Sequence, residues 1–166
     1  MNKNNMFMAK ALELAGQALA LGEFPVGCVI ESGGKVIATG NRKSTREKSN
    51  EIDHAEIIAL RNVLEDTVDV DLAQVTVYCT MEPCLMCFST LIVNGVTKFV
   101  YGYEDAMGGG TNLSLGQLAP LYRDIQVEIE GGVMRGECLE LFKTFFSEAD
   151  SGYLKDTYLA QYTLQQ

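Results

Sequence analysis

Residues 75–103, VTVYCTMEPCLMCFSTLIVNGVTKFVYGY, contain the clearest succession of elements in this chain of 166 residues. Residues 75–80 are largely apolar or β-branched and predict a buried strand. Pro83 fits the first turn of a helix that ends near residues 94–95, where Asn and Gly follow one another. Residues 99–103 predict a second strand. A strand, a helix and a strand in this order indicate an α/β fold.

The segments on either side continue the alternation of helices and strands. The sequence predicts a helix at 6–21, a hairpin with strands at 24–30 and 35–38, a polar loop at 41–53, a helix at 54–66, a glycine-rich loop at 108–112, a strand at 125–129 and a helix at 137–146. This order predicts an α/β sandwich around one sheet, and the hairpin makes that sheet mixed. We expect one domain over residues 1–166.

The composition is that of a globular protein: 47% of the residues are hydrophobic, 21% are charged, and only three are prolines. No run reaches the roughly 20 apolar residues that cross a bilayer, and no signal peptide is evident at the N-terminus, so we expect no membrane association. Five cysteines, two of them in a C-x-x-C, indicate metal-binding or catalytic thiols in a reducing cytoplasm.

The chemistry centres on three residues that can bind one metal ion. Cys84 and Cys87 lie three apart at a predicted helix start, so they share one face of that helix. Backbone amides at a helix start favour the thiolate form that zinc requires. His54 begins the preceding helix and completes a set of three ligands for one Zn²⁺ per chain. Three protein ligands, rather than four, leave a position for water, which is typical of catalytic zinc.

Glu56 is the predicted general acid and base. Zinc lowers the pKa of a bound water to about 7, and a nearby group must then accept and deliver the proton. Glu56 stands two residues after His54, which is the only histidine in the chain. H-x-E followed by P-C-x-x-C is typical of zinc-dependent nucleobase deaminases, whereas a C-x-x-C alone is a weak signal.

The sequence carries further segments around this motif. In chain order, over roughly residues 6–146, they are Pro25-Val26-Gly27, Asn41, His54-Ala55-Glu56, Glu82-Pro83-Cys84-Leu85-Met86-Cys87, Asp105-Ala106, Glu137-Cys138 and Phe145-Phe146. In these segments the chain resembles the cytidine deaminase-like superfamily, and within it the bacterial tRNA adenosine deaminase branch. The resemblance implies a three-layer α/β/α sandwich with a mixed sheet of about five strands, often assembled as a homodimer. It also implies the zinc and proton-shuttle roles given above.

The resemblance implies contacts with the substrate as well. Asn41 would contact the sugar or base, and the backbone N–H of Ala55 would reach a base carbonyl or ring nitrogen. Phe24, Pro25 and Val26 would form a wall of the pocket. The residues themselves leave alternatives open, because Asn41 in a Gly-Asn turn also fits turn chemistry and Phe24 also fits the core.

The remaining residues near the motif have simpler interpretations. Glu82 precedes the ligand turn and either contributes to the substrate site or bonds locally. Three further cysteines stand in apolar settings and are predicted to be buried thiols: Cys28, Cys79 and Cys138.

Charge bears on the substrate. The net charge of −9 repels polyphosphate. The tail at 147–166 departs from the tRNA-editing relatives, which carry a basic helix there, because it holds Glu148, Asp150 and Asp156 against only Lys155. We therefore expect hydrolytic deamination of a small nucleobase or nucleoside, with release of ammonia.

Two alternatives remain open. The first is deamination of adenosine in a tRNA anticodon loop, with phosphates contacted by the basic residues between Asn41 and His54, which we otherwise interpret as a solvated loop. These residues are Arg42, Lys43, Arg46 and Lys48. The second, more distant alternative is a non-catalytic zinc-stabilised interaction module. It predicts a fourth protein ligand or a Glu56 without a catalytic role. The chain has no second histidine, and the other cysteines lie in predicted strand or late-helix positions.

Overall fold

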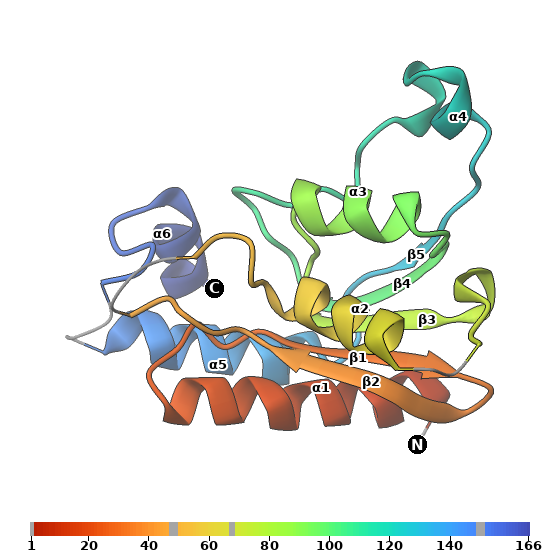
Figure 1. Cartoon of the computed structure of the whole chain (residues 1–166). Helices are drawn as coiled ribbons and strands as arrows, with labels where there is room; N and C mark the ends of the chain where they lie inside the picture. The colour runs from red at the N-terminus through yellow and green to blue at the C-terminus, as the bar shows by residue number, and fades with distance from the viewer. Residues whose placement is uncertain (1, 47–49, 67–68, 149–151) are drawn as a thin grey trace.

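The computed structural model describes residues 2–46, 50–66, 69–148 and 152–166. Lys48 of the basic loop and Asp150 of the acidic tail lie outside these ranges. Three layers make up the structure, with a sheet between two pairs of helices (Figure 1). The expected α/β/α sandwich is confirmed.

The sheet has five strands in the order β2-β1-β3-β4-β5. Their bounds are β1 Gly27–Ser32, β2 Lys35–Asn41, β3 Thr76–Met81, β4 Lys98–Tyr103 and β5 Glu128–Glu130. β1 pairs antiparallel with both β2 and β3, whereas β3–β4 and β4–β5 are parallel. The sheet is therefore mixed, and the predicted hairpin forms its β2 edge.

Helices cover both faces of the sheet. α1 (Lys3–Ala20) and α5 (Arg135–Ser147) lie on one face, and α2 (Ala55–Glu65) and α3 (Leu85–Val93) lie on the other (Figure 1). α6 (Tyr158–Gln165) packs against α5. Three short helices complete the described elements: η1 Leu72–Gln74, η2 Leu115–Gln117 and α4 Pro120–Arg123.

α1 shows why an amphipathic sequence covers the sheet. Its buried residues recur at helical spacing and are Phe7, Met8, Ala11, Ala15 and Ala18. The helix begins earlier than the predicted residue 6, because the Asn2 side chain accepts a hydrogen bond from the Asn5 amide at 2.8 Å and caps it. The small alanines bring the helix close to β1.

Gly40 fixes where α2 lies on the sheet. A Cβ at this position of β2 would lie 2.1 Å from the carbonyl oxygen of Ala55, the first residue of α2. Only glycine permits so close an approach of helix backbone to strand. The entrance of α2, and with it the position of His54, therefore depends on this contact.

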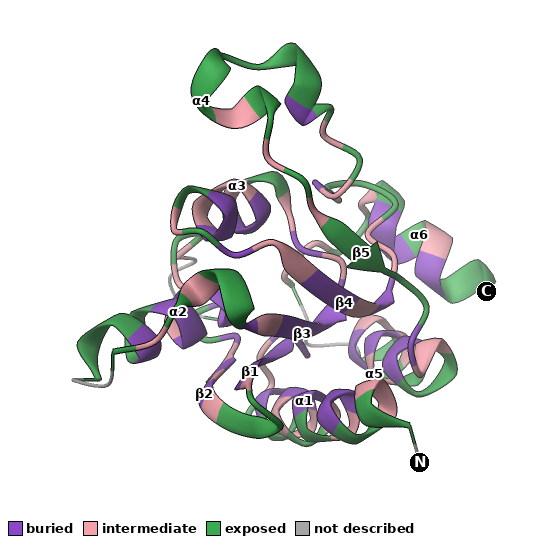
Figure 2. Cartoon of the chain, turned by 90° about the vertical axis from the view of Figure 1, so that its right-hand side faces the viewer, coloured by how far each residue is buried: buried purple, intermediate pink, exposed green. Residues whose placement is uncertain are grey.

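β3 and β4 run through the core between the two helical layers (Figure 2). Five of the six residues of β3 are buried, and Phe88 of α3 packs on Phe99 of β4 with ring centroids 4.9 Å apart. The predicted burial of the three further cysteines is confirmed: Cys28, Cys79 and Cys138 are all free, buried thiols.

Several predicted boundaries differ from the structure: β1 begins at Gly27 rather than at residue 24, and β2 extends to Asn41 rather than 38. Two further differences have a clear physical reason. Pro83 does not lie in the first turn of a helix, because Cys84 is the N-cap of α3 and the Pro83 carbonyl instead accepts a hydrogen bond from Gly110. The strand predicted at 125–129 is displaced to Glu128–Glu130, because Ile125 closes a turn onto Tyr122 and pairing with β4 begins only at Glu128.

Two features of the C-terminal third were not expected. α4 lies at the end of an excursion that stands away from the three layers (Figure 1). α6 lies in the tail, for which the sequence predicted no helix.

Across the described residues, no helix is both long enough and apolar enough for a membrane span.

Candidate metal centre

The three predicted ligands come from the starts of two helices on the same face of the sheet. His54 is the N-cap residue of α2, and Cys84 is the N-cap residue of α3. Cys87 lies in the first turn of α3. Only three residues separate the end of β3 from the start of α3, at the carboxyl edge of the sheet, where α/β proteins place their ligands.

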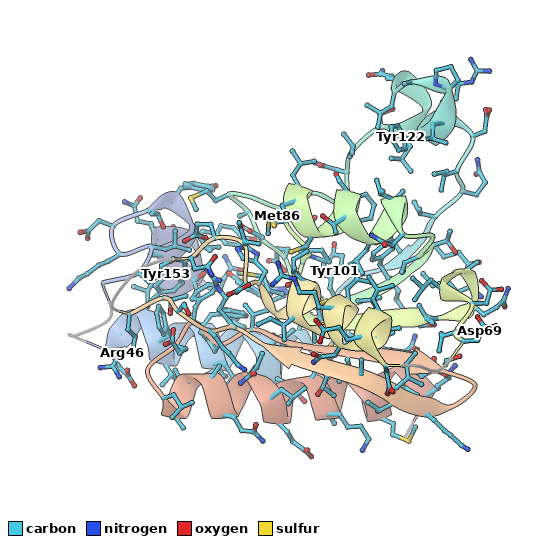
Figure 3. All side chains as sticks on the ribbon, in the orientation of Figure 1. Arg46, Asp69, Met86, Tyr101, Tyr122 and Tyr153 are labelled. Atoms are coloured by element: carbon cyan, nitrogen blue, oxygen red, sulfur yellow. The ribbon has the colours of Figure 1, made fainter. Side chains whose placement is uncertain are left out.

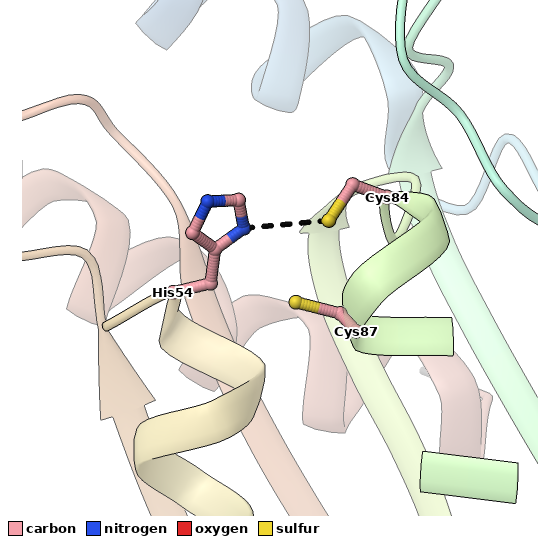
Figure 4. Close-up of side chains that lie close together, drawn as sticks. All are labelled: His54, Cys84 and Cys87. Atoms are coloured by element: carbon pink, nitrogen blue, oxygen red, sulfur yellow. Dashed lines mark hydrogen bonds between the residues drawn. The ribbon is translucent and has the colours of Figure 1, made fainter. Parts of the chain in front are cut away.

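The side chains of His54, Cys84 and Cys87 point toward one another (Figure 4). His54 Nδ1 lies 3.5 Å from Cys84 Sγ, and all three ligand atoms lie within 4.8 Å of one another. Tetrahedral zinc, with bonds of about 2.3 Å to sulfur and 2.0–2.1 Å to nitrogen, separates such a nitrogen and sulfur by about 3.5 Å. The donor set and its spacing therefore fit zinc.

The group of potential ligands ends at three. Among the described residues no further His, Cys, Asp or Glu joins these atoms. Cys84 and His54 are half-buried and Cys87 is buried, so the centre opens to solvent on the His54 and Cys84 side. An open fourth position is the property of a catalytic zinc site, and it counts against the non-catalytic module.

The two thiols differ in acidity. The hydrogen bond from Cys87 and the contact with His54 outweigh burial and lower the pKa of Cys84 to about 4. The same hydrogen bond to Cys84, together with burial, raises the pKa of Cys87. Burial lowers the pKa of His54, but the neighbouring Cys84 and Glu56 outweigh it and the net change is upward. One thiolate is therefore ready to bind a cation, and the metal displaces the proton of the second.

Glu56 lies beside the centre in the first turn of α2. Its side chain is only 3% exposed and lies near the Cys87 thiol. Burial raises the pKa of Glu56, although the charge of His54 opposes this change. A buried carboxyl of raised pKa next to a metal centre is suited to accept and return a proton.

The predicted substrate contacts surround this centre at different depths. Asn41 ends β2 and is half-buried, and Ala55 is fully buried at the start of α2. Phe24, Pro25 and Val26 are buried in the segment leading into β1. Contacts of these residues with a substrate remain predictions.

Phe24 belongs to an aromatic cluster with rings of α5 and of the C-terminal tail. The ring centroids of Phe142, Phe145, Phe146 and Tyr153 all lie between 5.2 and 5.9 Å from that of Phe24. Phe24 is only 5% exposed, so packing accounts for its position. If Phe24 also forms a wall of the pocket, it does so as a member of this cluster.

Glu82 bonds to the loop at 105–111. Its carboxylate accepts hydrogen bonds from the Thr111 hydroxyl at 2.5 Å and from the Asp105 amide at 3.2 Å. Gly110 completes the junction, because its amide donates to the Pro83 carbonyl and a Cβ there would lie 2.6 Å from the Leu85 nitrogen. The local-bonding interpretation of Glu82 therefore has direct support, and its substrate contact remains a prediction.

Arg42 corrects the interpretation of the basic loop as solvated. Its side chain is only 2% exposed, and its guanidinium donates to the carbonyls of Asn50 at 2.7 Å and Asp53 at 2.9 Å. Arg42 is thus an internal support for the loop. Lys43 and Arg46 are exposed.

Two residues near the centre were not found from the sequence. Glu51 Oε2 lies 3.4 Å from His54 Nε2, and the Tyr153 hydroxyl donates to the same oxygen at 2.9 Å. Because Glu51 stands only three residues before His54, the sequence could have suggested a contact between them. No sequence signal connects Glu51 with Tyr153, about a hundred residues later.

Comparison with known proteins gives a family match over most of the chain. The sequence model described as the cytidine and deoxycytidylate deaminase zinc-binding region matches residues 1–103. This region contains all three metal ligands and Glu56.

Curated relatives extend the similarity beyond this region. The tRNA-specific adenosine deaminase of Streptococcus pyogenes serotype M18 is 30% identical over 149 residues, which cover 89% of this chain and 92% of the relative. The enzyme of the same name from Haemophilus influenzae is 33% identical over 141 residues, 85% of this chain and 82% of the relative.

Solved structures agree with the fold. A structure from a study of A-to-I editing by tRNA:A34 deaminases at the wobble position of transfer RNA is 30% identical, with a TM-score of 0.67 over 82% of this chain and 98% of that one. The guanine deaminase from Nitrosomonas europaea superposes with a TM-score of 0.68 over 83% of this chain and 81% of its own, at 21% identity, which supports the fold alone. These comparisons favour the tRNA alternative over the small-molecule substrate expected from charge.

Proposed function

The chain belongs to the cytidine and deoxycytidylate deaminase zinc-binding family, and on that premise we propose that it deaminates adenosine in the anticodon loop of a tRNA. It is a zinc-dependent deaminase, a hydrolase acting on C–N bonds other than peptide bonds. The proposal concerns the substrate and the roles of individual residues.

The observation that carries the proposal is the extent of similarity to the tRNA-specific adenosine deaminases. The aligned 149 residues of the streptococcal relative include a substantial part of this chain beyond residue 103, where the family model ends. The similarity therefore is not restricted to the metal-binding motif that all zinc deaminases of this kind share.

Glu56 would move the protons of the reaction. Bound zinc supplies Lewis acidity that makes water nucleophilic near neutral pH. Glu56 would accept one proton of that water and deliver it to a ring nitrogen of the base, and would then carry the remaining hydroxyl proton to the departing amine. Ammonia leaves, and the oxygen of the water stays on the purine carbon. Burial favours this role, because it raises the pKa of Glu56 toward the pH at which the proton must be exchanged.

Asn41 and the Ala55 amide would orient the base. Ala55 follows the ligand His54 directly, so its backbone N–H lies at the entrance of α2, where the first amides of a helix have no partner within the helix. Asn41 ends the neighbouring strand β2. Both groups thus lie on elements that pack against each other, because α2, which begins directly after the ligand His54, contacts β2.

Contacts with RNA phosphates would fall to few basic residues. Lys43 and Arg46 are exposed in the loop that leads from β2 toward His54, whereas Arg42 is buried and bound within the loop. With a net charge of −9 and few phosphate contacts, RNA binding would be weak. Its dependence on salt would be shallow, because that dependence grows with the number of phosphates contacted.

A free nucleobase or nucleoside is the second candidate substrate. The same net charge of −9 favours it, since a small neutral base is not repelled. The tail at 147–166 is acidic, with Glu148, Asp150 and Asp156 against only Lys155, and this also favours a small substrate over RNA.

An ammonia-release assay separates the two candidates. The zinc-loaded protein would be given an anticodon stem-loop with adenosine at its wobble position, a matched stem-loop with guanosine there, and free adenine, guanine, cytosine and their nucleosides. We expect ammonia and inosine from the adenosine stem-loop alone. Turnover confined to a free base or nucleoside would overturn the tRNA substrate and support the second candidate.

Location and assembly are part of the proposal. A tRNA substrate agrees with the cytoplasmic location predicted from the thiols. The homodimer implied by the family resemblance would have exposed apolar side chains available on α3 and on the excursion that carries α4, among them Leu85, Val93 and Leu121. Sedimentation equilibrium would show a mass of twice 18.2 kDa if the dimer forms.

A further inference from the structure

We propose that Glu51 positions the metal ligand His54, and that the C-terminal segment holds Glu51 in place through Tyr153. This proposal concerns the metal centre and does not depend on which substrate the enzyme uses. The contacts of Glu51 with His54, Arg42 and Tyr153 were not expected from the sequence.

The first contact joins Glu51 to His54. His54 turns Nδ1 toward Cys84 and Nε2 toward the Glu51 carboxylate, at 3.5 Å and 3.4 Å respectively. The second distance is at the long end of the hydrogen-bond range. A carboxylate that accepts a hydrogen bond from Nε2–H leaves the lone pair of Nδ1 free for the metal, fixes the ring orientation and makes the ligand nitrogen more basic.

Two further groups hold the Glu51 carboxylate. The Arg42 guanidinium donates to Glu51 Oε2 at 3.1 Å, and the Tyr153 hydroxyl donates to the same oxygen at 2.9 Å. Arg42 is fixed in turn by the carbonyls of Asn50 and Asp53, which lie on either side of Glu51 in the chain. The carboxylate is therefore directed by charge and by hydrogen bonds toward one position.

Tyr153 brings the C-terminal segment to this network (Figure 3). Its ring lies under the Arg42 guanidinium, with 5.6 Å between the guanidinium carbon and the ring centroid, and its hydroxyl also accepts from Arg42 at 3.3 Å. The Tyr153 ring also packs against Phe24 of the core, with 5.4 Å between the two ring centroids. The tail is thereby tied to both the core and the metal ligand.

Packing alone does not explain Glu51. Its side chain is 57% exposed, so its removal leaves no cavity and costs little apolar burial. What its removal changes is the partner of His54 Nε2 and the counter-charge of the buried Arg42. A positioning role therefore predicts an effect on metal binding that exceeds the effect on stability.

Zinc affinity measured by competition with a chromogenic chelator tests the proposal directly. Glu51→Gln keeps the shape of the side chain and removes its charge, and we expect zinc affinity to fall about 10-fold or more, as is usual for a partner of a metal-bound histidine. The cobalt(II)-substituted protein should show a shifted d–d absorption spectrum, because the ligand field of His54 changes. The midpoint of thermal unfolding of the zinc-loaded variant serves as the check on folding.

A second variant tests the role of the tail. Tyr153→Phe should lower zinc affinity by a few-fold, less than Glu51→Gln does, because only one of the hydrogen bonds to Glu51 is lost. If Tyr153 acts through Glu51, the double variant should bind zinc no more weakly than Glu51→Gln alone.

Tyr162→Phe is the matched control. It removes another tyrosine hydroxyl of the C-terminal segment from another carboxylate, Glu104 at 2.8 Å, which has no contact with His54. Zinc affinity should not change in this variant. Equal zinc affinities and cobalt spectra in the wild type and Glu51→Gln would overturn the proposal, as would an equal loss in Tyr153→Phe and Tyr162→Phe.

Discussion

The first 103 residues and the C-terminal 63 differ in how their structure is specified. In the first region each metal ligand stands at a helix start that local sequence marks, and the family model covers it. In the second region, α6 is held by contacts between residues far apart in the chain. The Tyr162 hydroxyl bonds Glu104, and Thr163 bonds Tyr103. The chemistry is thus encoded locally, whereas the support of the site depends on tertiary contacts.

Of the changes that test this difference between the two regions, removal of a metal ligand should have the largest effect on activity. Cys87→Ser replaces a buried thiol of the centre with a poor zinc ligand. We expect the zinc content to fall from near one per chain to near zero and ammonia release to become undetectable. Elemental analysis of the purified protein and an ammonia assay provide the two readings.

Cys138→Ala is the control for this ligand variant. Cys138 is equally buried, but it lies in α5 and packs against Gly102, away from the centre. It should retain zinc and activity. Zinc retained at full content by Cys87→Ser would contradict the ligand set.

Disruption of the contact between the two regions should lower stability without removing the metal. Phe142 is fully buried in α5, and its ring centroid lies 5.3 Å from that of Phe24 and 5.4 Å from that of Tyr103. Phe142→Ala should reduce the free energy of unfolding by about 3–5 kcal/mol, because it leaves a cavity. Urea unfolding measures this change.

The exposed neighbour Glu140 supplies the control for Phe142. Its side chain is 73% exposed, so Glu140→Ala should change the free energy of unfolding by less than about 0.5 kcal/mol. A loss below about 1 kcal/mol in Phe142→Ala would mean that the C-terminal region is an appendage rather than part of the core.

A pH-dependent ion pair should give the smallest effect. The hydrogen bonds from Arg135, with smaller help from Tyr162, lower the pKa of Glu104 to about 2 from its ordinary value of 4.5. A lowered folded-state pKa stabilises the fold above about pH 4.5, and this contribution is lost as the pH falls toward 2.

Glu104→Gln tests this ion pair. Because the pair is about one-third exposed, the variant should be less stable than the wild type by no more than about 1 kcal/mol at pH 6. The difference should shrink as the pH is lowered to 3 and below, as measured by urea unfolding at each pH. A difference that does not change with pH would contradict the assigned pKa.

The sequence predicted the central elements well because their signals are local. β-branched and apolar residues mark β3, a glycine turn marks the β1–β2 hairpin, and H-x-E with P-C-x-x-C marks both helix starts of the centre. Each of these signals is contained within a few residues. The layers and the metal ligands followed from them.

The sequence could not predict features that depend on long-range partners. Arg42 belongs to a run of polar residues typical of a solvated loop, and its burial follows from carbonyls and from Tyr153, which only the folded chain brings together. The alternation at 125–129 was real, but pairing with Lys98 decides that β5 begins at Glu128. The net charge likewise could not identify the substrate, because the sequence does not show which charged side chains are exposed and which, like Arg42, are buried.

Glu56→Gln is the sharpest test of whether Glu56 carries the protons at the metal centre. Glu56 is not a ligand, and glutamine has nearly the same shape, so zinc content and the unfolding midpoint should match those of the wild type. Ammonia release should fall by about 10²–10⁴-fold or below detection, because the amide cannot accept and return the proton. Turnover within a few-fold of the wild type, with zinc bound, would show that Glu56 is not the proton carrier.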